Sequence, residues 1–237
     1  MEASVGSEMA ATIASTCADG GLDLHASTAV GAYNALVDAP FHLPGADECL
    51  VIVIGNSRAI WPHITSFVLS QDPQPTDPVD AYVEALIGRA TAGLAELIDV
   101  RYSHEPPPRR IAIQRLADVA GLAWLSPSHL CVHPVFGPWI ALRAAIILDV
   151  PAPAVLPARA AAPGCDCAKG CGPLLTAALA SQPGEPITSD PITSERVQAE
   201  WRRWVAMRDG CPIGRGHRYD DDQIEYHYIG TRPASWG

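Results

Sequence analysis

The most informative segment of the chain is Leu130-Cys131-Val132-His133-Pro134-Val135-Phe136-Gly137-Pro138-Trp139-Ile140-Ala141-Leu142-Arg143-Ala144-Ala145-Ile146-Ile147-Leu148. Two apolar runs flank a short stretch that contains Pro134, Gly137 and Pro138, and such residues are typical of a hairpin connection. The second run alternates, so its odd and even positions face opposite sides of a strand. The segment therefore predicts two strands paired across a turn.

A charged residue, Arg143, lies in the middle of the second run, between the alanines Ala141 and Ala145 on its face of the strand. A buried guanidinium needs a partner, because an unpaired buried charge costs several kcal/mol. The small neighbours leave room for a large group. One face is expected on the core, with Ile140, Leu142, Ala144, Ile146 and Leu148. The other is expected on a ligand cleft, with Trp139, Ala141, Arg143, Ala145 and Ile147.

The composition excludes several classes of protein. The 237 residues fit one large domain or a domain with an appendage, and a net charge of −10 argues against a nucleic-acid partner. There is no apolar run of membrane-spanning length, and residues 1–20 lack the basic and apolar regions of a signal peptide. A cytoplasmic location is therefore expected, and the protein is expected to be either a monomer or a homodimer. The seven cysteines then suggest thiol, metal or redox chemistry rather than a disulfide framework.

Helices alternate with antiparallel strands along the chain, which predicts an α+β fold. Strands are expected at Cys49–Ile54, a continuous apolar run, and at 99–102. Helices are expected at 8–17, from Pro78 to about Leu97, at 110–120, from about Pro173, and at Ser194–Met207. Asp77 is the expected N-cap before Pro78, and Gly121 is expected to end the helix that precedes it. Three segments follow from this: a core at 1–150, a Pro/Ala-rich strap with a cysteine cluster at 151–193, and a C-terminal helix and tail at 194–237 that pack on the core.

The order of four sequence blocks resembles the CblC-type cobalamin-processing proteins. The first segment carries their His-Pro-x-Phe-Gly-x-Trp-x-x-x-Arg pattern. The other blocks are Ala32-Tyr33-Asn34-Ala35-Leu36 with Phe41-His42-Leu43-Pro44, Thr76-Asp77-Pro78-Val79-Asp80 with Gly88-Arg89, and Trp201-Arg202-Arg203-Trp204 through Arg208-Asp209 with Arg218-Tyr219. The resemblance spans residues 33–228. It implies a nitroreductase-like sheet flanked by helices and removal of the upper axial ligand of cobalamin.

The resemblance also implies site residues. Arg143, Arg208 and Arg232 match positions that hold the carboxylates of glutathione or another low-molecular-weight thiol, and guanidinium forks pair well with carboxylates. A corrin ring needs a broad, mostly apolar cleft. The residues expected to line it are Trp124, His133, Phe136, Trp139 and Ala141. Asp118 stands where the family often has a histidine, which removes a polar contact expected from that position.

A cysteine cluster departs from the CblC pattern. Cys165-x-Cys167-x3-Cys171-Gly172-Pro173 resembles the end of the iron–sulfur motif of epoxyqueuosine reductases, and Cys211 is a fourth candidate ligand. An iron–sulfur cluster, a zinc site, thiol redox chemistry or thiolate ligation of cobalt, and no role at all remain open. The other cysteines, Cys17, Cys49 and Cys131, lie in apolar contexts and are expected to be buried fillers.

The sequence therefore predicts an enzyme that binds cobalamin and removes its upper ligand by thiol-dependent dealkylation, reductive decyanation or both. Its partners would be a corrinoid, a thiol and an electron-donor reductase, with no nucleic acid or membrane. The alternatives are an iron–sulfur corrinoid reductase, a non-catalytic cobalamin carrier, and a flavin-dependent reductase, for which fold analogy is the only support.

Overall fold

The chain folds into two units, which are described separately. The computed structural model describes residues 5–154, 158, 167–180 and 194–237. The first unit contains residues 1–125 and 140–161, and the second contains residues 126–139 and 162–237. Most of the predicted strap at 151–193 lies outside the described residues, so the predicted three-segment division stays a prediction.

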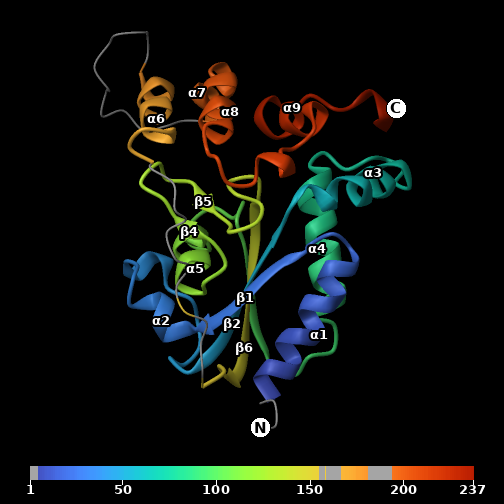
Figure 1. The fold of residues 1–237 in the computed structure, drawn as a ribbon. Coiled ribbons are helices and arrows are strands. Elements are labelled where there is room, and N and C mark those ends of the chain that lie inside the picture. Colours follow the sequence, from blue (N-terminus) through green and yellow to red (C-terminus); the bar gives the residue numbers. More distant parts are fainter. Residues whose placement is uncertain (1–4, 155–157, 159–166, 181–193) are drawn as a thin grey trace. The chain divides into compact units, whose positions relative to one another are not determined.

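A four-stranded antiparallel sheet of order β1–β2–β6–β3 organises the first unit. The strands are β1 (Leu24–Ala29), β2 (Cys49–Asn56), β6 (Ala141–Pro151) and β3 (Leu97–Tyr102). All eight residues of β2 are buried, which confirms the central strand predicted from the apolar run. Helices cover both faces of the sheet, so the α+β prediction is confirmed (Figure 1).

The helices of the first unit form two groups (Figure 1). Helix α4 (Pro78–Ala90) packs against α1 (Val5–Asp19) and α3 (Trp61–Leu69). On the other side of the sheet, α2 (Val30–Asn34) packs against α5 (Ile113–Val119). The remaining elements are the short strand β4 (Trp124–Leu125) and the 3₁₀ turns Ala39–Phe41 and Arg58–Ile60.

The second unit contains short helices around apolar clusters. Its elements are β5 (Cys131–Val132), α6 (Cys171–Leu179), α7 (Ser194–Ala199), α8 (Trp201–Asp209), α9 (Asp221–Ile229) and the 3₁₀ turns Arg215–His217 and Ala234–Trp236. Helix α8 packs against α6 on one side and contacts α7 and α9 as well. None of the helices in the described part of the chain combines the length and apolarity needed to cross a membrane.

The predicted strand pair is wrong in its pairing. Strand β6 pairs with β2 and β3, and β5 is not part of their sheet. The run that begins at Leu130 forms only a two-residue strand, and a tight turn closed by hydrogen bonds between His133 and Gly137 follows it. Because β6 lies between β2 and β3 in a sheet that helices cover on both faces, its residues 144–148 are all buried, whereas residues 141–143 at its start are partly exposed. The buried Ala145 and Ile147 of the expected ligand face are thus part of the core, and Ala141 and Arg143 at the start of the strand are the residues of that face that remain partly exposed.

Several helix boundaries also differ from the prediction. Helix α4 ends at Ala90 rather than near Leu97, and Gly93 then adopts φ +76° before β3 begins. The predicted helix at 194–207 is two helices, because the backbone of Glu200 leaves the helical region with φ −113° and ψ 24°. Asp77 does precede α4, but its side chain makes no capping hydrogen bond.

Helix α5 starts three residues later than predicted. The backbone N–H of Ala112 donates to the hydroxyl of the buried Tyr33 at 3.0 Å, which holds the preceding residues outside the helix. Its end agrees with the prediction, because Gly121 adopts φ +75°, a left-handed conformation that glycine accepts without strain.

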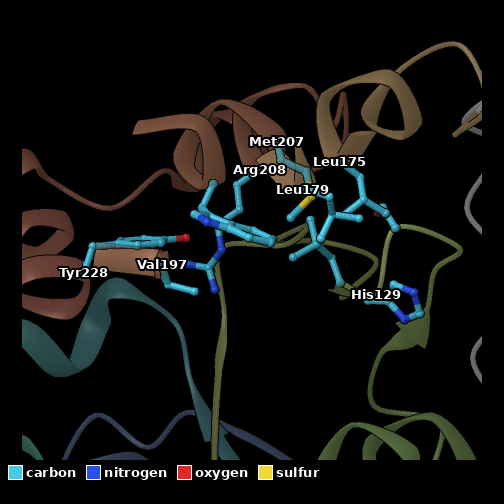
Figure 2. A pocket seen from close by; sticks show the side chains of 10 residues that line it. His129, Leu175, Leu179, Val197, Met207, Arg208 and Tyr228 are labelled. Carbon is cyan, nitrogen blue, oxygen red and sulfur yellow. The ribbon is translucent and has the colours of Figure 1, made fainter. Parts of the chain in front are cut away.

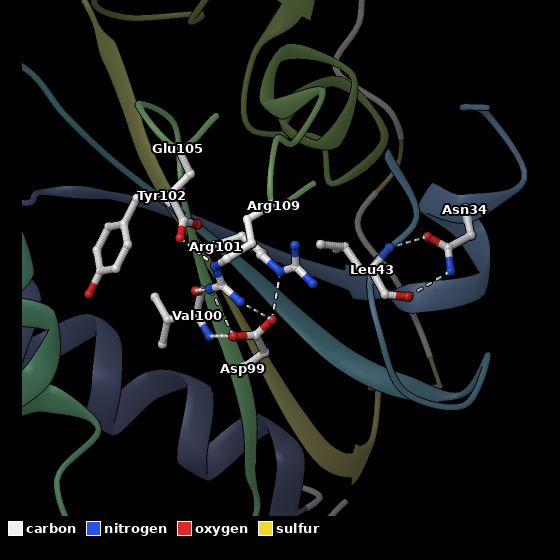
Figure 3. A network of polar contacts seen from close by, with 8 residues as sticks. All are labelled: Asn34, Leu43, Asp99, Val100, Arg101, Tyr102, Glu105 and Arg109. Carbon is white, nitrogen blue, oxygen red and sulfur yellow. Dashed lines mark hydrogen bonds and ion pairs between the residues drawn. The ribbon is translucent and has the colours of Figure 1, made fainter. Parts of the chain in front are cut away.

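An ion-pair network fixes the edge strand β3 and the loop that follows it (Figure 3). The Nε of Arg101 lies 2.6 Å from Asp99 Oδ2, and a terminal nitrogen of Arg109 lies 3.0 Å from Asp99 Oδ1. Arg109 also donates to the carbonyl of Val100 at 2.6 Å and pairs with Glu105. Burial by itself would raise the pKa of the Asp99 carboxyl, but hydrogen bonds from Arg109 and Arg101 outweigh it and hold that pKa below its usual value. These two arginines therefore have structural partners.

Candidate functional site

Arg143 lies at the partly exposed start of β6, and a buried amide holds it in place. Its Nε donates to Oδ1 of Asn56 at 2.7 Å, and Asn56 is fully buried at the end of β2. The backbone carbonyl of Arg143 accepts a hydrogen bond from Ser103 at 2.8 Å. The structure thus gives the Arg143 guanidinium an amide partner in Asn56, and binding of an anionic ligand by Arg143 stays a prediction.

Asn56 is a functional candidate that the sequence analysis missed. It pairs with Ala141 across β2 and β6, and the preceding residue, Gly55, lies opposite Leu142. A Cβ at Gly55 would come within 2.6 Å of the carbonyl oxygen of Ala141, so the strands approach here only because this residue is glycine. The side chain of Asn56 thereby reaches Arg143, which lies 87 positions away in the sequence.

Trp139 is almost completely buried within the second unit, with 1% of its surface exposed. Its ring packs in a cluster with Val205, Tyr219 and Ile224, and the ring of Tyr219 meets it edge-on at 5.5 Å. The guanidinium of Arg208 lies 5.5 Å from the centre of the Trp139 ring. The described contacts give Trp139 a packing role, and contact with a corrin stays a prediction.

His133 and Phe136 shape the turn that precedes Trp139. The Nδ1 of His133 accepts hydrogen bonds from the backbone N–H groups of Val135 at 3.1 Å and Phe136 at 3.2 Å. The Phe136 ring lies 5.0 Å from the His133 ring and 4.8 Å from that of His217. Because Nδ1 accepts, the neutral ring carries its proton on Nε2.

The other predicted site residues are divided between the two units. Trp124 and Ala141 are partly exposed and belong to the first unit, as Arg143 does, whereas Arg208 and the exposed Arg232 belong to the second. Asp118, at the position where a histidine was expected, is buried and accepts a hydrogen bond from the backbone of Leu125 at 3.2 Å. The structure thus gives Asp118 a structural role.

The cysteine cluster lies in the second unit, and its first member, Cys165, is outside the described residues. Cys167 is partly exposed, while Cys171 is buried at the start of α6 and its thiol donates to Oγ of Ser128 at 3.2 Å. Cys211 is buried after α8. Among the described residues no group of three or more His, Cys, Asp or Glu side chains is placed to hold a metal. Metal binding by the four cysteines therefore stays a prediction.

The predicted buried fillers are confirmed. Cys17, Cys49 and Cys131 are all buried. Burial raises the pKa of the Cys17 thiol to about 11, so this thiol stays protonated and unreactive at neutral pH.

The second unit contains a cavity of about 320 Å³, here named the Arg208 cavity (Figure 2). Helices α6, α7, α8 and α9 and the segment before β5 contribute to its wall. The lining residues are Ser128, His129, Leu130, Leu175, Leu179, Val197, Trp204, Met207, Arg208 and Tyr228. Of the predicted site residues that the structure describes, only Arg208 lines it. Its lining residues come from four helices and the segment before β5, and no single stretch of sequence indicates that they meet.

Comparisons with known proteins agree with the predicted family. No family model matches the chain. A bovine (Bos taurus) protein named cyanocobalamin reductase/alkylcobalamin dealkylase is 30% identical over 224 residues, which cover 85% of this chain and 71% of the bovine one. A zebrafish (Danio rerio) protein of the same name is 29% identical over 238 residues, covering 88% of this chain and 85% of its own.

Two solved structures share the fold. The C. elegans B12-trafficking protein CblC has a TM-score of 0.63 and 18% identity, with 97% of this chain and 94% of that one covered. A selenomethionine-labelled epoxyqueuosine reductase has a TM-score of 0.53 and 12% identity, covering 91% and 68% of the two chains. At such identities these structures support the nitroreductase-like fold and no more. From the bovine relative, the chain belongs to the CblC-type family of cyanocobalamin reductases/alkylcobalamin dealkylases.

Proposed function

We propose that this protein binds cobalamin as its substrate and removes the upper axial ligand. The observation that carries the proposal is the match of 85% of the chain to a protein named for both cyanocobalamin reduction and alkylcobalamin dealkylation. The same comparisons do not favour the corrinoid-reductase and carrier alternatives, since the likeness to epoxyqueuosine reductase is one of fold.

Dealkylation would use a thiol as the second substrate. A thiolate sulfur attacks the carbon of the alkyl group, a new S–C bond forms, and the Co–C bond breaks with both electrons left on cobalt. The products are a thioether and cob(I)alamin. The protein supplies binding and orientation, while cobalt and the thiol carry the reactivity.

Arg143 is the candidate in the first unit for binding a carboxylate of this thiol. The residue as a whole is partly exposed, and its Nε–H is committed to Asn56 at 2.7 Å. The buried amide fixes the direction of the side chain, which limits the entropy lost when a carboxylate binds. Arg208 and Arg232 remain the candidates in the second unit, and each arginine can be tested by itself.

Cyanide removal needs a different chemistry. Electrons must reach cobalt before cyanide leaves, so an external donor is required, and an electron-donor reductase or a reduced flavin would fill that role. The partly exposed Cys167 is a further candidate donor among the described residues. A low-molecular-weight thiol alone is expected to support dealkylation but not decyanation.

Binding can be measured without turnover. Methylcobalamin mixed with an excess of the protein is expected to change its visible spectrum toward the base-off form, in which the lower ligand has left cobalt. The same titration with cyanocobalamin, with and without a reductant, separates binding from reduction. An unchanged methylcobalamin spectrum at saturating protein would contradict the proposal.

A further inference from the structure

Three polar side chains lie at the same end of the sheet in the first unit, on strands that neighbour one another. Asp23 directly precedes β1, Asn56 ends β2, and Arg143 lies near the start of β6. The first residue of β1 pairs with the residue before Asn56, and Asn56 itself pairs with the first residue of β6. The antiparallel order of these strands therefore brings the three side chains to one edge.

The two ends of the Asn56 amide have different partners. Its oxygen accepts from Arg143 Nε at 2.7 Å, and its nitrogen donates to the backbone carbonyl of Ser57, also at 2.7 Å. A flipped amide would turn its nitrogen toward the Arg143 N–H and its oxygen toward the Ser57 carbonyl. Donor would then face donor and acceptor would face acceptor. The Ser57 carbonyl thus determines that the amide oxygen faces Arg143.

Asp23 holds Ser57 through both oxygens of its carboxylate. Oδ1 accepts from the backbone N–H of Ser57 at 2.7 Å, and Oδ2 accepts from its hydroxyl at 2.6 Å. The Ser57 hydroxyl oxygen in turn accepts from the backbone N–H of Ala59 at 3.1 Å. Hydrogen bonds to a carboxylate are stronger than those between neutral groups. Since Ser57 and Asn56 are buried, water competes little for these bonds.

We infer that Asp23 is a positioning residue for Arg143 and acts through Ser57 and Asn56. The carboxylate fixes the Ser57 backbone, the Ser57 carbonyl orients the amide of Asn56, and the amide oxygen orients the guanidinium. The inference rests on the thiol-binding role proposed above for Arg143. A guanidinium held in one direction loses less conformational entropy when its ligand binds. Asp23 therefore affects the thiol concentration that the reaction requires, and not the rate at saturating thiol.

Dealkylation of methylcobalamin at a series of glutathione concentrations tests this role. Asp23→Ala is expected to raise the half-saturating glutathione concentration by about 2- to 10-fold, the net effect of one hydrogen bond, with kcat unchanged. Asp23→Asn should behave as wild type does, because its amide can still accept from the Ser57 N–H and donate to the hydroxyl. In an Asn56→Ala background, Asp23→Ala should have no further effect, since the two residues act through one contact.

A second measurement follows Arg143 without cobalamin or thiol. Its Nε–H signal in a proton–nitrogen NMR spectrum is identified by its absence in Arg143→Lys, and the hydrogen bond to the buried Asn56 should slow its exchange with water. Asp23→Ala is expected to abolish this protection. Asn34→Ala is the matched control and should preserve it. Asn34 also makes two hydrogen bonds to the backbone of one residue, Leu43, at 3.1 and 2.9 Å, elsewhere in the first unit (Figure 3).

Two results would overturn the inference. One is protection of the Arg143 Nε–H that persists in Asp23→Ala. The other is an equal rise in the glutathione requirement when Asp23→Ala is introduced into the wild type and into Asn56→Ala, because Asp23 would then act by another route. Loss of protection in Asp23→Ala, together with an unchanged glutathione requirement in Arg143→Ala, would instead support the positioning of Arg143 and contradict thiol binding by it.

Discussion

Replacing Arg143 by alanine is expected to raise the thiol concentration that gives half-maximal dealkylation by roughly 10- to 100-fold, the equivalent of about 1.5–3 kcal/mol for a hydrogen bond to a charged group. The substitution removes the guanidinium proposed to bind a carboxylate of the thiol. Asn56 orients this guanidinium through a hydrogen bond of 2.7 Å between Arg143 Nε and Asn56 Oδ1. Methylcobalamin binding should change little. The measurement is the rate of methylcobalamin loss at a series of thiol concentrations.

Arg101→Gln is the control for this variant. Arg101 lies on the adjacent strand, opposite Ala145, and its guanidinium pairs with Asp99. The Arg101→Gln substitution also removes one positive charge, and its effect on the thiol concentration required for dealkylation should be small. A third variant, Asn56→Ala, leaves the guanidinium in place but removes its support, so it should raise the thiol requirement by a smaller factor. If Arg143→Ala dealkylates with an unchanged thiol requirement, Arg143 does not bind the thiol.

Ile52→Ala is expected to lower the free energy of unfolding by about 2–5 kcal/mol, the range for removing a large aliphatic side chain from a core. Ile52 is fully buried at the centre of β2 and lies opposite Ile146, which is equally buried. The substitution removes apolar burial and leaves a cavity that the two flanking strands cannot fill. Urea denaturation followed by circular dichroism measures the change.

Ile98→Ala is the matched control, because the same side chain is 37% exposed on the edge strand β3. Its effect should be within about 0.5–1 kcal/mol of zero, as for partly exposed positions. Equal destabilisation by the two substitutions would contradict the central position of β2.

The local sequence predicted the positions of strands and helices better than it predicted which strands pair. The continuous apolar run at 49–54 indicated a buried strand because a strand covered on both faces leaves no polar positions. The pairing of β6 with β2 joins residues about ninety positions apart. No short turn connects the two strands, so the local sequence gives no sign that they pair. The break between α7 and α8 at Glu200 could not be predicted, because neither glycine nor proline occurs there and the sequence on both sides favours a helix.

The site shows the same division. The position of Arg143 among small residues predicts a functional role, which stays a prediction. The asparagine that binds its guanidinium lies on another strand, and nothing near Arg143 in the sequence identifies it. The Arg208 cavity needed tertiary structure for a similar reason, since its wall combines residues from 128 to 228. A candidate residue within one segment could therefore be predicted from the sequence, whereas a cavity whose wall combines several segments could not.

Thiol-dependent dealkylation can be tested directly by following the methyl group. Methylcobalamin labelled with carbon-13 in the methyl group is incubated anaerobically with the protein and a thiol, and the products are identified by mass spectrometry. Transfer of the methyl group to the thiol gives one labelled S-methyl thioether for each methylcobalamin consumed, together with cob(I)alamin, and no such product is expected without the protein. Loss of methylcobalamin without the labelled thioether, or no loss with any thiol despite bound cobalamin, would contradict it.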